Sequence, residues 1–336
     1  MPEIRLSCLV QARFAGKAQK DLAEMETRFS HVRGRVQLVG GDIVTPDLGM
    51  GGHDKLKLRA DLAGAFHLAA VYDLAVERQV AQRINVEGTE NVLRFLEDSP
   101  RGSHLHYVST AYVSGNATGV FRETDLDAGQ GFRNHYEETK FLAEVAVARS
   151  GQPATIYRPA IVVGDSRSGE TGKFDGPYFA VRAMERLPSP GLFLRVGAGR
   201  SPLNVVPVDF VVEALAQLAA NPLAHGRTFH LTDPEPLAVR ELSGLLASAL
   251  GRRFLFVPVP LGLGKRLIGA AWIQAYLGMP VQALDYFDHA CAYDATQATR
   301  LLEPLGVRCP RFSDYVGRLL AFYKANSDSV RRSAMI

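Results

Sequence analysis

Short β-rich segments alternate with helical segments along the first half of this 336-residue chain. Residues 76–97 form the longest helical segment, because apolar side chains recur there near the helical spacing. Such alternation predicts an α/β fold with a doubly wound parallel sheet that helices cover on both faces. The expected strands are residues 4–10, 36–39, 62–68, 104–108 and 154–157, and the expected helices are residues 18–28, 76–97 and 136–149.

The alternation loosens after Val163. Residues 165–174 are rich in glycine, serine and charge, as in a loop, while a helix at 208–220 and a strand at 228–231 belong to the sheet again. From residue 237 onward the pattern is mostly helical. We therefore expect a Rossmann-like domain of residues 1–163 and about 201–236, a small and mostly helical substrate lobe of about 164–200 and 237–328, and a tail of 329–336.

Composition and charge exclude several classes of protein. A net charge of +3 gives no reason to expect nucleic acid or an anionic membrane as partner. Cys8, Cys291 and Cys309 have neither a metal-ligand spacing nor a disulfide pattern, so we expect no metal and favour a reducing cytoplasm. Charges interrupt both the N-terminus and the apolar stretch 254–280, so we expect no signal peptide and no transmembrane segment.

Hydroxyl side chains follow the strand 104–108 directly, at Ser109 and Thr110. Ligands of open parallel sheets bind beyond the carboxyl ends of the strands. A hydroxyl at either position is therefore placed to hydrogen-bond a substrate oxygen.

Tyr136 and Lys140 open the helix 136–149, and their spacing of four residues puts both side chains on one helix face. A nearby ammonium favours the phenolate, so we expect Lys140 to lower the pKa of Tyr136 and to let it transfer a proton. Such pairs also arise on solvated helix faces. The preceding strand that ends in Ser109-Thr110 favours the catalytic interpretation here.

Several motifs together resemble those of extended short-chain dehydrogenases/reductases, the NAD-dependent epimerase/dehydratase-like proteins. They are HLAA at 67–70, NVEGT at 85–89, VSTAYVSG at 108–115, YEETK at 136–140 and YRPAIVVG at 157–164. Further stretches, GGDI at 40–43, VVGDS at 162–166, GETGKFDG at 169–176 and VPVDFV at 206–211, resemble the branch of fatty acyl-CoA reductases and thioester-reductase domains, with its male-sterility-type NAD-binding domain. The resemblance covers roughly residues 1–235.

This resemblance implies roles for individual residues. Thr110 would hydrogen-bond the substrate carbonyl, Tyr136 would transfer the proton, Lys140 would hold the cofactor ribose, and Asn85 would support a proton-relay water. Contacts to the cofactor would also come from Asp42 and Ile43 at the adenine, Ala69 and Ala70 at its middle, and Pro159, Ala160, Ile161 and Val162 at the nicotinamide.

One unit that the resemblance leads us to expect is missing from the sequence. Such domains open with a strand, a glycine-rich turn and a helix, and the amides of the turn hold the pyrophosphate. Residues 4–10 instead match the second strand of the family, so the missing strand would lie between 4–10 and 62–68. Either the start lies too far downstream by about 30 residues, or the gene is truncated.

The residues after the strand 4–10 bear on the choice of cofactor. An arginine at this place grips the 2′-phosphate of NADP in the resembled branch, whereas this chain has Gln11, with Arg13 two residues later. Because a guanidinium suits a phosphate, the sequence favours NADP(H) over NAD(H).

The function that the resemblance implies is NAD(P)H-dependent reduction of an acyl thioester, on coenzyme A or a carrier protein, to an aldehyde or alcohol. One alternative is a sterol, flavonoid or nucleotide-sugar dehydrogenase, reductase or epimerase of the same superfamily. Another is a non-catalytic relic that no longer binds nucleotide. The helices 76–97 and 136–149 form a candidate homodimer face.

Overall fold

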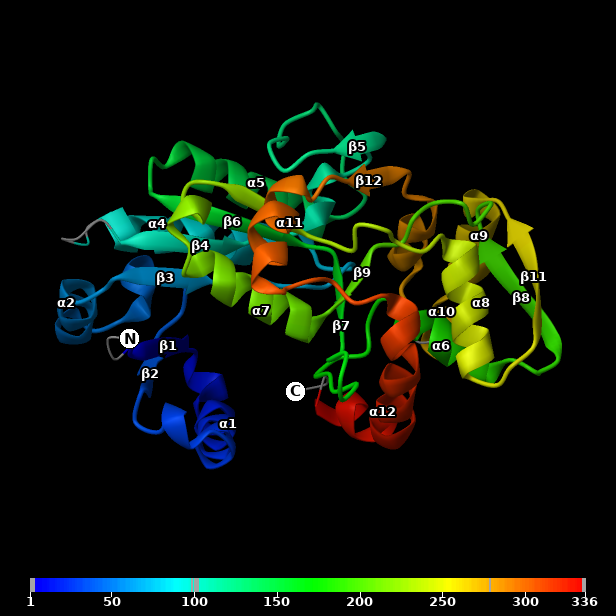
Figure 1. Cartoon of the computed structure of the whole chain (residues 1–336), viewed down its shortest axis with the longest axis horizontal. Coiled ribbons are helices and arrows are strands. Elements are labelled where there is room, and N and C mark those ends of the chain that lie inside the picture. Colours follow the sequence, from blue (N-terminus) through cyan, green and yellow to red (C-terminus); the bar gives the residue numbers. More distant parts are fainter. Residues whose placement is uncertain (1–3, 98, 100–102, 278, 334–336) are drawn as a thin grey trace.

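The computed structural model describes residues 4–97, 99, 103–277 and 279–333, with the backbone alone for 328–333. At its centre is a parallel sheet, shown in Figure 1. Its strands, in spatial order, are β10 (Thr228–Leu231), β6 (Ala154–Pro159), β4 (His104–Val108) and β3 (Gly64–His67). The register pairs Tyr107 of β4 with His67 and Ile156, so the carboxyl ends of neighbouring strands lie at one edge.

A second parallel pair, β1 (Leu6–Val10) and β2 (Val36–Gly40), lies beside β3 in Figure 1. Among the described strands, β1 pairs only with β2 and β3 pairs only with β4. Leu9, Val39 and Ala65 nevertheless pack against one hydrophobic cluster, so the two sheets share a core without sharing a hydrogen bond between strands. The sequence predicted a missing strand at this place.

Helices cover both faces of the sheet, as the alternation predicts. Leu96 of α4 and Val147 of α5 pack with Leu105 on one face, and Leu218 of α7 packs with Phe229 on the other. The helices of this domain are α1 (Ala15–Arg28), α2 (Gly52–Ala60), α3 (Arg78–Ala81), α4 (Gly88–Glu97), α5 (His135–Arg149) and α7 (Val208–Ala219). The expected helix 76–97 begins at Arg78 and contains a π-helical turn, Gln82–Glu87, between α3 and α4.

The remaining segments build the lobe at the right of Figure 1. Its helices are α6 (Pro177–Arg186), α8 (Val239–Ala249), α9 (Leu261–Ile268), α10 (Ala271–Leu277) and α12 (Phe312–Ser333). Met184, Leu246 and Leu319 join three of them in one core. The predicted tail therefore begins inside α12, and its last three residues, 334–336, lie outside the described part.

The sequence patterns did not predict the strands of the C-terminal part. β11 (Phe254–Val259) pairs in parallel with β8 (Gly191–Val196). The run 254–259 is apolar at almost every position, so it lacks the two-residue alternation that reveals a half-buried strand. Short parallel pairs join β7 (Ile161–Val163) to β9 (Val205–Pro207) and β5 (Gly119–Phe121) to β12 (Cys291–Tyr293), and α11 (Thr296–Leu302) packs on α7.

All three cysteines are free. Within the described residues, no helix is long and apolar enough to cross a membrane, and no three His, Cys, Asp or Glu side chains are grouped to hold a metal ion.

Candidate active site at the carboxyl edge of the sheet

Thr110 and Tyr136 meet where β4 ends. Thr110 follows β4 directly, is buried, and accepts a hydrogen bond at Oγ1 from the Tyr112 amide at 3.3 Å. Its hydroxyl is also within hydrogen-bonding reach of the Tyr136 phenol. The structure thus brings together the two side chains that were expected to hold and protonate a substrate oxygen.

The first turn of α5 presents Tyr136 at this edge because Asn134 fixes where the helix begins. The Asn134 side chain accepts a hydrogen bond from the Glu137 amide at 3.0 Å, which is the usual contact of a helix cap. Glu137 and Glu138 put negative charge in the first turn, which favours the positive end of the helix dipole.

Burial sets the protonation state of Tyr136. Desolvation raises the pKa of Tyr136 well above its ordinary value, and nearby Tyr72 adds to the shift, while the Thr110 hydrogen bond opposes it. The Tyr72 ring stands edge-on to the Tyr136 ring, with 5.0 Å between centroids. The expected lowering of the pKa by Lys140 is therefore wrong for this structure, and Tyr136 keeps its proton at neutral pH.

Lys140 faces the sheet instead of the Tyr136 phenol. Its Nζ donates hydrogen bonds to Tyr107 Oη at 2.8 Å and to the Val108 carbonyl at 2.7 Å. Burial lowers the pKa of Lys140 to about 7, and Glu144 opposes the shift. Lys140 is not among the groups that shift the pKa of Tyr136, which agrees with its hydrogen bonds on the sheet side.

Replacing Lys140 with methionine is expected to stabilise the folded chain at low pH. The folded pKa of about 7 lies below the ordinary 10.5, so the unfolded chain binds this proton more tightly. The penalty on folding is complete below pH 7 and fades as the pH rises towards 10.5. At about pH 6 we expect a gain of about 2 kcal/mol in unfolding free energy.

Urea unfolding at several pH values measures this gain, with Lys57→Met at an exposed position as control. A Lys140→Met chain that is no more stable than the native chain at low pH would show that burial does not lower the pKa of Lys140.

A buried ion pair beneath the site was not found from the sequence. Arg158 Nη2 lies 2.5 Å from Glu144 Oε1, and both side chains are almost completely buried. Ser109 Oγ donates to Glu144 Oε2 at 2.5 Å. Ser109 is thus bound to this pair, which leaves Thr110 as the hydroxyl at the sheet edge. Glu144 and Arg158 lie 14 residues apart in the sequence, on α5 and β6, so no local spacing of residues predicts this ion pair.

Asn85 connects the loop after β3 to helix α5 through hydrogen bonds. Its Oδ1 accepts from the Val71 amide at 2.8 Å, and its Nδ2 donates to the Val71 carbonyl and to Thr139 Oγ1 at 3.0 Å. These contacts hold the loop 69–71 against α5. Support of a relay water by Asn85 stays a prediction.

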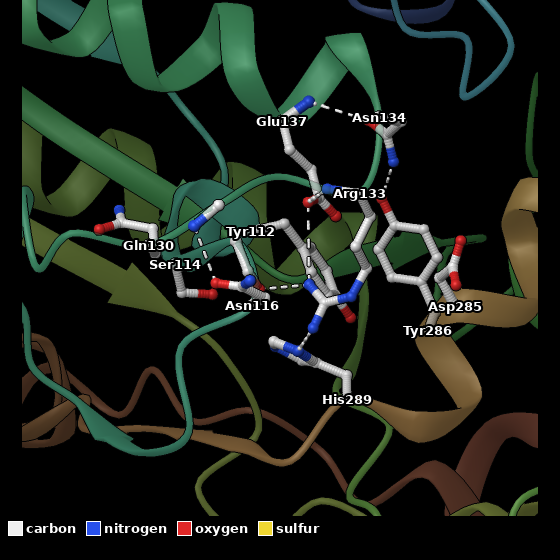
Figure 2. A network of polar contacts seen from close by, with 12 residues as sticks. Tyr112, Ser114, Asn116, Gln130, Arg133, Asn134, Glu137, Asp285, Tyr286 and His289 are labelled. Atoms are coloured by element: carbon white, nitrogen blue, oxygen red, sulfur yellow. Dashed lines mark hydrogen bonds and ion pairs between the residues drawn. The ribbon is translucent and has the colours of Figure 1, made fainter.

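A polar network ties the lobe to the N-terminus of α5, as Figure 2 shows. Arg133 Nη2 lies 2.6 Å from His289 Nδ1, and Asn134 Nδ2 donates to Tyr286 Oη at 3.0 Å. Because a guanidinium can only donate, His289 accepts at Nδ1 and donates from Nε2 to Tyr293 Oη at 2.9 Å. Burial, aided by Arg133, lowers the pKa of His289 to about 3, so this imidazole is neutral.

The residues expected at the cofactor lie along the same edge of the two sheets. Gln11 and Arg13 follow β1, Asp42 and Ile43 follow β2, and Ala69 and Ala70 follow β3, while Pro159, Ala160, Ile161 and Val162 lie at the end of β6 and in β7. The Ile43 side chain packs closely against Gly88, because a Cβ on Gly88 would lie only 2.8 Å from Ile43 Cδ1. Asp42 Oδ1 accepts a hydrogen bond from the Val44 amide at 3.1 Å.

A nicotinamide cofactor fits these residues only in part. Thr110, Tyr136 and Lys140 supply hydroxyl and amine groups at one end, and Asp42 supplies a carboxylate at the other. Between them, the described residues contain no glycine-rich turn that leads from a strand into a helix. Within the part of the chain that the structure describes, the doubly charged pyrophosphate therefore has no cradle of backbone amides.

A pocket of ≈ 490 Å³ opens beside the first turn of α5. It is lined by the loop 74–77, by residues 132–135, by Glu138 and, from the lobe, by Gln282. Two of its lining residues, His135 and Glu138, belong to the same first turn of α5 as Tyr136, which does not itself line the pocket.

Residues 1–215 match the NAD-binding family described as male sterility protein, and the match spans more than half of the chain. The chain belongs to this family. Homologues of the chain are NAD(P)-dependent reductases of the extended short-chain type, so the fold and family predicted from the motifs are confirmed.

The relatives include a peptide synthetase and a fatty acyl-CoA reductase. A nonribosomal peptide synthetase, asaC, of Aspergillus flavus is 29% identical over 252 residues, which cover 70% of this chain and 24% of that protein. The fatty acyl-CoA reductase wat of Drosophila melanogaster is 28% identical over 220 residues, 57% of this chain and 43% of that protein. The chain thus spans less than half the length of either relative.

A solved structure agrees with the fold. The terminal R domain of the myxalamid PKS-NRPS pathway superposes with a TM-score of 0.80 at 23% identity, over 96% of this chain and 84% of that domain.

Proposed function

We propose that this protein reduces an acyl thioester, on coenzyme A or on a carrier protein, with NADPH as the reductant. The observation that carries the proposal is a buried, protonated Tyr136 beside the Thr110 hydroxyl at the carboxyl edge of the sheet. The fatty acyl-CoA reductase and the peptide synthetase among the relatives support the choice of a thioester.

Thr110 and Tyr136 have different roles towards the substrate. Thr110 donates a hydrogen bond to the thioester carbonyl oxygen, and Tyr136 gives its proton to that oxygen as negative charge develops there. The cofactor, when bound, supplies the hydride to the carbonyl carbon. Collapse of the resulting hemithioacetal releases the aldehyde and the thiol. A raised pKa suits this direction, because reduction needs a tyrosine that still carries its proton.

We propose NADPH over NADH because of Arg13. Its guanidinium is exposed after β1 and is oriented by a 2.8 Å hydrogen bond from Nε to Gln11 Oε1. Arg13→Ala should raise the Kd for NADPH about tenfold, since a charge-assisted hydrogen bond is lost, and leave NADH binding unchanged. Equal losses for the two cofactors would contradict this assignment.

The test of the reaction is a substrate panel. Acyl-CoA and carrier-bound thioesters are compared with ketones, sterols and nucleotide sugars, using the 336-residue chain and an N-terminally extended chain side by side. We expect thioesters to be consumed and aldehyde or alcohol to form. Turnover of a ketone or nucleotide sugar alone would support the rival dehydrogenase or epimerase. Turnover of nothing, with no NADPH binding, would support a non-catalytic protein.

The pocket beside α5 is a candidate route for the acyl thioester, since the sheet domain and the lobe both line it. We also propose a cytoplasmic location, from the three free cysteines, and a homodimer through the surface of α3 to α5. Val80 and Leu142 are exposed there.

A further inference from the structure

An exposed apolar surface covers part of the lobe. β8 and β11 form a two-stranded parallel sheet there, and the helices α9 and α10 follow β11 in the chain. Figure 1 shows β8, β11 and α9 at the opposite end of the view from α2. The large apolar side chains of these elements that are at least 43% exposed are Leu192, Leu194, Leu255, Leu263, Leu267, Trp272 and Tyr276. We call this set the lobe patch.

One face of the β8–β11 sheet is only partly covered by a helix. Side chains alternate along a strand, so Leu192, Leu194 and Val196 of β8 point to the same face. A Cβ on Gly264 of α9 would lie 2.8 Å from Val196 Cγ2, so α9 packs on this face at the carboxyl end of β8. Leu255 is the register partner of Leu192, and these two leucines are 67% and 61% exposed. The uncovered part of the sheet and α9 therefore lie on the same side of the lobe.

The outer faces of α9 and α10 continue this surface. Leu263 and Leu267 of α9 lie one turn apart and are both exposed. Trp272 and Tyr276 of α10 also lie one turn apart, and they are 73% and 51% exposed. Residues 269–272, at the junction of the two helices, are all exposed, so the two apolar faces join.

The polar side chains of α10 form their hydrogen bonds within the lobe. Gln274 Nε2 donates to the Gly269 carbonyl at 3.1 Å, and Gln274 Oε1 accepts from the Val281 amide at 3.1 Å. Tyr276 Oη donates to the Arg186 carbonyl at 3.2 Å. A protein interface normally carries about one hydrogen bond per 100–200 Å². The lobe patch has few groups to supply such bonds, whereas the apolar part of a lipid surface needs none.

The charge on the same segments is entirely positive. Neither residues 186–208 nor residues 252–284 contain an aspartate or a glutamate. Lys265 pairs with Asp285 at 2.6 Å, while Arg253 and Arg266 are exposed. The net charge of the whole chain, +3, does not reflect this local asymmetry, which is complementary to an anionic surface. The cations of the two segments are Arg186, Arg195, Arg200, Arg252, Arg253, Lys265 and Arg266.

We propose that the lobe patch binds the headgroup region of an anionic lipid bilayer. Helices that present leucine and aromatic side chains, with arginine or lysine beside them, lie in the plane of such an interface. Tryptophan and tyrosine prefer the headgroup level. α9 has 8 residues and α10 has 7, which is too short to span a bilayer, so the contact is peripheral. This binding surface goes beyond the proposed reductase function and does not depend on it.

The fluorescence of Trp272 tests the proposal directly, because the chain contains 1 tryptophan. The 336-residue chain is mixed with vesicles of phosphatidylglycerol and phosphatidylcholine, or of phosphatidylcholine alone. With the anionic vesicles, we expect the Trp272 emission to shift to shorter wavelength and lipids brominated near the headgroup to quench it. The binding constant should be at least about tenfold larger for anionic than for neutral vesicles, and it should fall as salt is added.

Substitutions within the lobe patch, compared by co-sedimentation with anionic vesicles, give a second test. Leu267→Glu places a carboxylate on the exposed face of α9, so binding should fall at least about tenfold. Leu223→Glu is the matched control, because Leu223 is 66% exposed and lies outside the lobe patch. The control should bind like the native chain, and both variants should unfold at the same urea concentration as that chain.

The charge of Arg266 is tested in the same assay, with a variant that keeps the charge as control. Arg266→Gln should weaken binding to anionic vesicles several-fold, whereas Arg266→Lys should bind like the native chain. This comparison still decides the matter if Leu267→Glu proves unstable. Equal binding of Arg266→Gln and Arg266→Lys would overturn the proposal, and so would equal binding of Leu267→Glu and Leu223→Glu.

Two other occupants of the lobe patch have distinct results. A shift of the Trp272 emission that grows with protein concentration in the absence of lipid would overturn the proposal in favour of a second copy of this chain. A shift caused by an acidic carrier protein, but by no vesicle, would overturn it in favour of a protein partner. Vesicle binding is measured without cofactor or thioester, so a failure of the reductase assay leaves the lipid proposal standing.

Discussion

Tyr136→Phe is expected to lower kcat for thioester reduction by about 10²- to 10⁴-fold, with a small change in KM. Phenylalanine keeps the ring packing against Tyr72 but removes the O–H that protonates the carbonyl oxygen. Steady-state kinetics in the NADPH-binding form of the chain measure the effect. Tyr276→Phe, in the lobe, is the control, because its hydroxyl donates to the Arg186 carbonyl and does not contact Thr110 or Tyr136.

The control should retain activity within a few-fold of the native protein. A Tyr136→Phe enzyme that kept more than about a tenth of the native kcat would show that the proton comes from another group.

Arg158→Leu is expected to cost about 3–5 kcal/mol of unfolding free energy, the largest stability effect that we predict. The substitution leaves the Glu144 carboxylate buried, with Ser109 as its remaining hydrogen-bond donor. An uncompensated buried charge is far more costly than the loss of the pair itself. Urea unfolding measures the difference.

The double variant Arg158→Leu/Glu144→Leu is the matched control. Because it removes both charges, it should recover most of the lost stability. A double variant as unstable as Arg158→Leu would show that side-chain packing, and not the isolated carboxylate, sets the cost.

Local patterns predicted the parallel sheet and the place of Thr110 after β4. The hydroxyls after residues 104–108 follow a strand, and parallel strands end at one edge, so Thr110 was placed correctly without coordinates. The unpaired edges of β1 and β3 were also predicted, because the motifs begin with what resembles the second strand of the family.

The features that the sequence did not predict depend on contacts between residues far apart in the chain. The pKa of Tyr136 depends on burial beneath the loop that carries Tyr72, and no spacing along α5 reports this. Arg133 and His289 lie 156 residues apart, so their contact appears only when the lobe folds against α5. β11 was missed because an apolar run reads equally as buried strand or buried helix.

The most direct test of the central claim is transfer of deuterium to a thioester. The NADPH-binding form of the chain is incubated with an acyl-CoA and NADPH deuterated at the transferring position, and the product is trapped and analysed by mass spectrometry. The account predicts an aldehyde, or the alcohol derived from it, that carries deuterium at the former carbonyl carbon, with one thiol released per molecule of thioester reduced. An intact thioester, under conditions in which the same protein transfers deuterium to a ketone or a sugar, would contradict it.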